Sequence, residues 1–89
     1  MTVDEAIEEL AAAKGNYRCA RMVKVLESLG FVVHTKRNPG HKTYKHPNLP
    51  DWTGSNFNCG HGRNPQVLPV YVRNVSRILK QLKDELESV

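Results

Sequence analysis

The spacing of apolar residues changes twice along this chain, and these changes restrict its fold more than any other feature. Apolar residues recur at helical spacing up to residue 30, alternate with a period of two within 31–59, and return to helical spacing from residue 69. A segment patterned for a helix does not form a stable strand, and the reverse also holds. The order helix, helix, strand, strand, strand, helix therefore predicts an α+β fold. We expect three antiparallel strands to pack one face on the last two helices.

Local signals predict where the helices begin and end. Thr2 and Glu5 have the spacing of a capping box, which predicts a helix over about 3–13. Gly30 is the expected C-terminal cap of a second helix, and Pro69 lies in the expected first turn of a third. The apolar stripes of the second and third helices are expected to be Cys19, Met22, Val23, Leu26 and Leu29, and Val72, Val75, Leu79, Leu82 and Leu86.

The middle of the chain is patterned for strands. Residues 31–36 and 41–46 are rich in β-branched and aromatic side chains, and the turn residues of 37–40 separate them, which predicts a hairpin. Residues 55–59 form a weaker third strand after a loop over 47–54 that contains two prolines and a glycine. Residues 1–89 are expected to form a single domain, because a typical domain has roughly 100–150 residues.

The location of the protein is expected to be cytoplasmic. No apolar run approaches the ~20 residues of a membrane span, and the acidic, amphipathic N-terminus is unlike a signal peptide. With two cysteines and no secretory signal, both thiols are expected to be reduced. Cys19 and Cys59 are then interpreted as small apolar core residues.

Charge is distributed very unevenly along the sequence. Residues 1–13 carry −4 and residues 84–89 carry −3, whereas 14–83 hold all 13 basic residues and only two acidic ones. The basic body has a charge of +11, which the net value of +4 conceals. Such a body attracts nucleic acid, because cations that contact phosphates release condensed counterions. A merely solvated basic surface and an acidic protein partner are the alternatives.

His41 is the strongest candidate for chemistry among the four histidines. Imidazole is the side chain suited to acid–base catalysis near neutral pH. His41 directly follows the Pro39-Gly40 turn at the expected start of a strand, where the glycine would allow close approach of a phosphodiester backbone. His34, His46 and His61 are more readily explained as polar strand or loop residues.

Other catalytic signatures are missing, so no cofactor is expected. The Cys and His residues lack the paired spacing of structural zinc sites, and only Glu27 and Asp51 in the basic body could help to hold magnesium. There is no phosphate-binding glycine loop and no Gly-x-Ser-x-Gly elbow. Cleavage of RNA without metal remains possible, because the ribose 2′-hydroxyl, which DNA lacks, can itself be the nucleophile, so the expected substrate of a nuclease here is RNA. Tyr44 is one of several aromatics that could stack on bases, although core packing is the commoner role.

The segments 22–31 and 40–47 resemble the HicA toxins of bacterial type II toxin–antitoxin systems. HicA proteins are similar in having a helix that ends in Leu-Gly-Phe, a strand, a turn before a histidine, an aromatic three residues on, and His-Pro. His41, Tyr44 and His46 keep this spacing. The resemblance covers roughly residues 16–86, including a His61-Gly62 loop and the closing helix.

The resemblance implies a fold like the double-stranded-RNA-binding domain, with the helix over about 3–13 as an addition. It implies an mRNA interferase, which is a metal-independent endoribonuclease that a HicB-type antitoxin neutralises. The family's catalytic histidine corresponds to His41, and Arg37, Lys42 and Lys45 would hold phosphates, with Gly40 and Tyr44 completing the RNA contact. Two features depart from the family. Pro39-Gly40 replaces the usual Gly-Ser, and the loop over 47–54 is longer.

Two other readings remain open at the level of sequence. One is a catalytically silent RNA-binding module on the same fold, which would contact phosphates and 2′-hydroxyls by shape. The other is an interaction protein whose acidic ends and apolar patches serve a protein partner. Only the enzyme requires His41 for turnover, and only the two RNA-binding readings predict steep salt dependence of RNA affinity.

Overall fold

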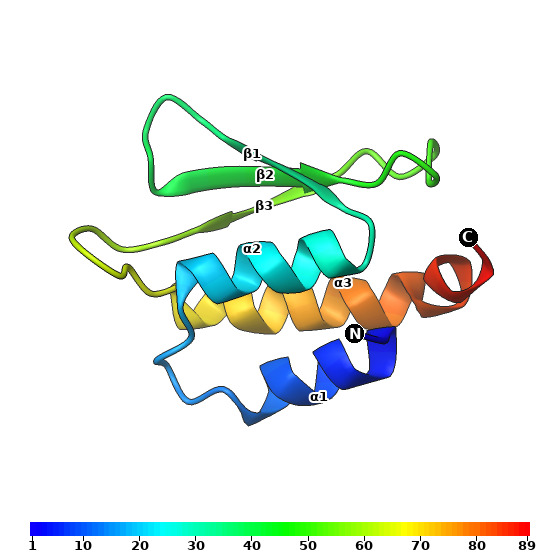
Figure 1. The fold of residues 1–89 in the computed structure, drawn as a ribbon, viewed down its shortest axis with the longest axis horizontal. Helices are drawn as coiled ribbons and strands as arrows, with labels where there is room; N and C mark the ends of the chain where they lie inside the picture. Colours follow the sequence, from blue (N-terminus) through cyan, green and yellow to red (C-terminus); the bar gives the residue numbers. More distant parts are fainter.

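A computed structural model describes residues 1–89, and its elements follow the predicted order (Figure 1). The elements are α1 (Val3–Ala12), α2 (Cys19–Ser28), β1 (Val32–Thr35), β2 (His41–Lys45), β3 (Ser55–Asn58) and α3 (Pro69–Ser88). The predicted α+β class is therefore confirmed. The strands are one or two residues shorter than predicted.

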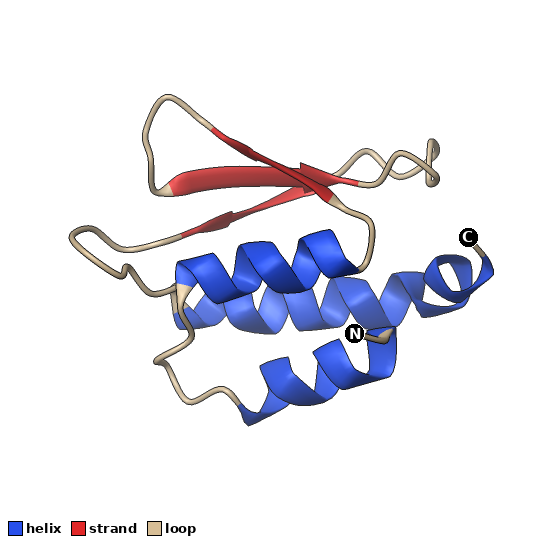
Figure 2. Cartoon of the chain, in the orientation of Figure 1, coloured by secondary structure: helices blue, strands red, loops and turns tan.

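The three strands form one antiparallel sheet in the order β1-β2-β3. As Figure 2 shows, the sheet is one layer, and helices cover only one of its faces. One face of the sheet packs on the last two helices, as predicted, with β1 on α2 and β3 on α3, whereas α1 packs on α3 on the side away from the sheet. The other face of the sheet is left open to solvent.

The residues predicted to begin or end the helices do so at three positions in the chain. The Thr2 side chain accepts from the Glu5 N–H, and the Glu5 carboxylate accepts from the Thr2 N–H, which completes the capping box. Gly30 has a φ of +92° just after α2, in the left-handed region that glycine adopts without steric cost. Pro69 is the first residue of α3, where its missing N–H costs no helical hydrogen bond.

A single hydrophobic cluster of 20 buried residues connects the helices to the sheet. Tyr44 and Phe57 enter it from the sheet, and Met22, Leu26 and Leu79 from the helices, all five with fully buried side chains. The stripe predicted for α3 is confirmed. On α2 the predicted Cys19, Met22 and Leu26 are buried, but Val23 and Leu29 are only half-buried, and Val25, which was not predicted, is buried.

The prediction of reduced thiols was wrong, because Cys19 and Cys59 form a disulfide. The two residues are 40 apart in sequence, and their Cα atoms lie 5.9 Å apart. The reason is a contact that periodicity does not reveal: the Cys19 N–H donates to the Pro65 carbonyl, and Cys59 pairs with Val67. The expectation of a cytosolic location loses the support that it drew from reduced thiols. None of the helices combines the length and apolarity needed to cross a membrane.

Candidate functional site

The open face of the sheet, called here the outer face, carries polar side chains from all three strands. Antiparallel partners share a face, and successive residues of a strand alternate between faces. Tyr44 and Phe57 point to the helices, so the pairings place their neighbours on the opposite side. The residues of the outer face are Val32, His34, His41, Thr43, Lys45 and Asn56, with Asn58 at its margin.

His41 has a fixed backbone and an exposed side chain. Its N–H donates to the Asn38 carbonyl at 2.9 Å, and its carbonyl accepts from the Lys36 N–H at 2.9 Å. These bonds close the hairpin tip, which comprises residues 36–40, and hold the start of β2. The ring itself has no hydrogen-bond partner in the protein and is exposed. His41 is therefore a positioned imidazole that a ligand on the outer face can reach.

The three basic residues predicted to hold phosphates lie in different structural environments. Lys45 is exposed on the outer face, four residues from His41 along β2, which is about 13 Å at the usual rise of a strand. Arg37 is exposed in the hairpin tip. Lys42 points to the opposite face, where its Nζ donates to Thr35 Oγ1 at 3.0 Å and to the Pro39 carbonyl at 3.3 Å. His41 and Lys45 thus define a strip along β2, with Arg37 beyond one end.

Gly40 and Tyr44 are placed inside the protein. A Cβ on Gly40 would lie 2.8 Å from the Cys59 carbonyl oxygen, and the Gly40 carbonyl accepts from the Cys59 N–H at 2.8 Å. The glycine therefore allows a close approach of the chain's own backbone. The Tyr44 side chain has no exposed surface, and burial raises the pKa of its hydroxyl to about 12. Neither residue is exposed to RNA in this structure.

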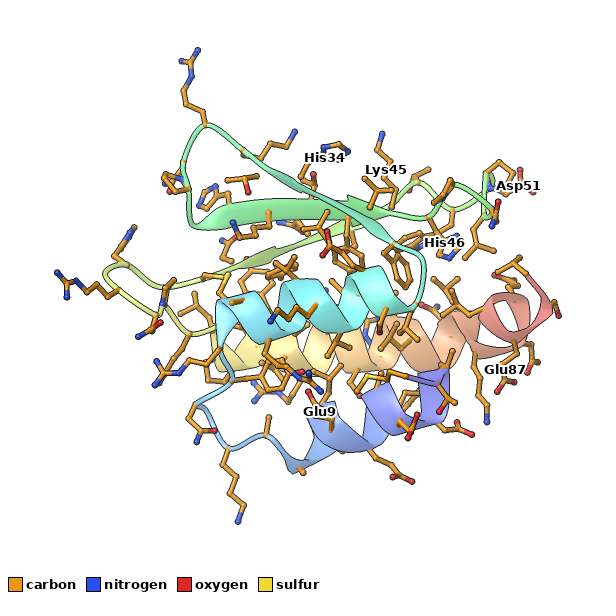
Figure 3. All side chains as sticks on the ribbon, viewed as in Figure 1. Glu9, His34, Lys45, His46, Asp51 and Glu87 are labelled. Carbon is orange, nitrogen blue, oxygen red and sulfur yellow. A yellow bond between two sulfur atoms is a disulfide. The ribbon has the colours of Figure 1, made fainter.

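The other three histidines occupy distinct environments. His34 is exposed on β1, and Figure 3 shows it rising beside Lys45 on the side of the sheet away from the helices. The two line a shallow depression of about 210 Å³. His46 is buried between the sheet and the end of α2, where Nε2 bonds to the Leu29 carbonyl at 3.0 Å. His61 is exposed in the loop after β3.

Sequence reasoning gave His34 little weight and missed Asn56 and Asn58. Asn58 is paired directly with His41, donates to the Tyr71 hydroxyl at 3.2 Å, and has an amide oxygen that is buried without a partner. Successive side chains of a strand alternate between the two faces of the sheet. Counting this alternation along both strands from the hairpin tip would have assigned His34 to the same face as His41. The register of β3 follows a long loop, and no local signal predicts it.

The positive charges around the sheet are not neutralised by acidic side chains. The only two salt bridges, Arg21–Glu9 and Lys83–Asp4, involve helix residues. No acidic residue occurs between Glu27 and Asp51, a stretch that includes β1, the tip and β2. Arg37 and Lys45 therefore remain free to meet phosphates, whereas Lys42 is hydrogen-bonded to Thr35 and Pro39.

The chemical capacity of the outer face follows from these positions. No three of the chain's His, Cys, Asp or Glu side chains gather in a way that would hold a metal ion. The face offers an exposed imidazole and cations without acidic partners on an open surface, which suits an extended polyanion better than a small molecule. No known protein family, curated protein or solved structure matches the chain.

Proposed function

We propose that this protein is a HicA-like toxin, a metal-independent endoribonuclease that cleaves mRNA on the outer face of its sheet. The observation that carries the proposal is the exposed His41 ring on a strip whose surrounding cations have no acidic partners. The order helix, strand, strand, strand, helix within 19–88 is also the one expected of a double-stranded-RNA-binding-domain-like fold. mRNA in the cytoplasm is the proposed substrate and a HicB-type antitoxin the proposed partner.

In the proposed reaction His41 acts on the ribose 2′-hydroxyl. The imidazole accepts the 2′-hydroxyl proton while the 2′-oxygen bonds to the adjacent phosphorus and the bond from phosphorus to the 5′-oxygen breaks. The leaving oxygen takes a proton, so the products are a 2′,3′-cyclic phosphate and a 5′-hydroxyl. Lys45 and Arg37 hold flanking phosphates.

The test is cleavage of a labelled single-stranded RNA in EDTA, with the cyclic phosphate as the readout. His41→Ala is expected to lower cleavage at least 100-fold, because loss of a positioned acid or base costs about that factor. His61→Ala is the matched control, since His61 is also exposed but lies in the loop after β3, outside the strands of the sheet. Circular dichroism checks folding, and filter binding is expected to show nearly unchanged RNA affinity.

A cleaving His41→Ala variant, or products with a 3′-hydroxyl, would overturn the assignment of His41. RNA affinity is expected to fall steeply with salt, with a slope of about −0.7 per phosphate contacted on a single strand. A flat salt response would instead favour the interaction-protein alternative.

One observation favours the second candidate, a catalytically silent RNA-binding module. Gly40 makes its close approach to Cys59, not to an open surface where a phosphodiester could lie. If the wild-type protein and His41→Ala both bind RNA and neither cleaves it, the silent module is the function.

A further inference from the structure

We infer that the groove between α1 and α3 binds an acidic peptide segment that carries large apolar side chains. The groove has a volume of about 660 Å³, within the range of ligand-binding clefts. Leu10 of α1 and Val72 and Ser76 of α3 are buried at its floor. Gly15, in the loop after α1, approaches Pro69 and closes one end.

The charged residues that line this groove are all basic. Lys14 lies in the loop after α1, and Arg73, Arg77 and Lys80 follow one another along an exposed side of α3. Neither salt bridge of the protein involves any of them, and Arg77 donates only to Asn74 within its own helix. Like charges four residues apart on a helix destabilise it slightly. The protein carries this repulsion without a compensating acidic group of its own.

The combination of an apolar floor and a basic rim selects the class of ligand. An RNA backbone would meet the cations but has no apolar group to cover the exposed apolar lining, which Ala11, Ala13 and Pro69 provide. A peptide with Asp or Glu beside Leu or Phe satisfies both, because apolar anchors provide affinity and charge complementarity provides specificity and association rate. An acidic segment of a protein partner is therefore the occupant that fits.

The groove is separate from the outer face of the sheet. α1 packs on the side of α3 away from the sheet, so the layer of α2 and α3 lies between the groove and β1–β3 (Figure 1). Glu9 lies between α1 and α2 (Figure 3), and its carboxylate already accepts two hydrogen bonds from Arg21. The inference goes beyond the proposed nuclease and does not depend on it.

The test is selection of random 12-residue peptides displayed on phage against the full-length protein. Enriched peptides are expected to have a net negative charge and at least one large apolar residue. A synthetic copy of the most enriched one is then titrated into the ¹⁵N-labelled protein. It is expected to shift the amide resonances of Lys14, Val72 and Arg77 and to leave those of β2 unchanged.

Charge reversal provides the matched comparison. Arg73→Glu/Arg77→Glu is expected to weaken the peptide at least 10-fold. Lys24→Glu/Arg63→Glu changes the net charge equally at exposed positions away from the groove and is expected to change binding less than 2-fold. Replacing the apolar residues of the peptide by Ser is also expected to abolish binding.

Four outcomes would overturn the inference: no enrichment, enrichment of neutral or basic peptides, shifts that map elsewhere, or equal loss in both variants. Polyuridylate that shifts the same groove resonances would assign the groove to RNA instead. RNA cleavage by Arg73→Glu/Arg77→Glu is measured in parallel. A wild-type protein that binds the peptide but cleaves no RNA would refute the proposed nuclease alone.

Discussion

At the scale of single residues, His46 illustrates how burial decides the task of a histidine. The Asn48 N–H donates to Nδ1, so Nε2 must carry the proton and donate to the Leu29 carbonyl. The ring also packs edge-on against Phe31, with ring centres 5.0 Å apart. Nε2 therefore joins the end of β2 to the end of α2, and Nδ1 fixes the turn that follows β2, whereas His41 at the other end of the strand keeps its ring free.

Gly30→Ala is expected to destabilise the fold more than Gly62→Ala. Both glycines have a similar positive φ, +92° and +95°, which costs a side chain about 1–2 kcal/mol. At Gly30 the new Cβ would also lie 2.7 Å from His46 Nε2, whereas at Gly62 it would meet no atom within 4 Å. Urea denaturation of the two variants measures the difference. Equal losses would contradict the structural role given to His46.

Residue-level prediction from sequence succeeded where the cause is local. The capping of α1 by Thr2 and the termination of α2 at Gly30 depend on neighbours in the chain, and both are confirmed. Gly40 could not be assigned in this way, because its contact partner, Cys59, is distant in sequence. Tyr44 was expected to contact RNA on the strength of the family resemblance, although core packing is the commoner role of such aromatics, and the structure places it in the core.

At the scale of elements, a three-residue cluster joins α1 to the start of α2. The Glu9 carboxylate binds Arg21 through two hydrogen bonds, of 2.6 and 2.8 Å, and accepts a third from the Tyr17 hydroxyl. The Arg21 guanidinium is the main reason that the pKa of the Glu9 carboxyl lies below its ordinary value. α1 is therefore held partly by a charged pair whose strength depends on pH.

Glu9→Gln is expected to weaken the dependence of stability on pH in acid. Because the pKa of Glu9 is lower in the folded state, the unfolded state binds more protons as the pH falls below about 4.5. The stabilisation from Glu9 is present above that pH and is lost as the pH falls through the folded value. Urea unfolding between pH 7 and pH 3 measures the slope.

Glu8→Gln is the control for this prediction, since Glu8 is exposed and has no hydrogen bond or salt bridge in the structure. Identical slopes for the two variants would refute the account of α1 docking.

The order and type of the elements were predictable because each apolar period is local. The predicted element boundaries agree with those of the structure to within one or two residues. The long apolar stripe of α3 was the clearest signal. The docking of α1 on α3 was not predictable, because the apolar stripe of Val3, Ala6 and Leu10 does not indicate which element it packs against. The position of Asn58 beside His41 depended in the same way on non-local register.

At the scale of the whole molecule, the Cys19–Cys59 disulfide is expected to provide much of the stability. Closing a loop of this length in the unfolded chain stabilises the native state by about 4 kcal/mol in the chain-entropy model. Reduction by a phosphine reductant is therefore expected to lower the free energy of unfolding by about 3–4 kcal/mol. Urea unfolding with and without reductant, alongside thiol counting, measures this.

The double variant Cys19→Ala/Cys59→Ala is the control and is expected to be insensitive to reductant. Oxidised and reduced wild-type protein of equal stability would show that the cross-link constrains nothing in the unfolded chain.

The pairing of residues 17–19 with 65–67 has a consequence for the time course of synthesis. The Tyr17 carbonyl accepts from the Val67 N–H, and the Cys19 N–H at the start of α2 donates to the Pro65 carbonyl. On a growing chain these groups have no partners until three-quarters of the sequence has been made. The N-terminus of α2 therefore gains its backbone hydrogen bond to Pro65 late. The sheet that contains His41 cannot pack on α3 before α3 has been synthesised. A protein built in this way is expected to become competent only after α3 has been synthesised.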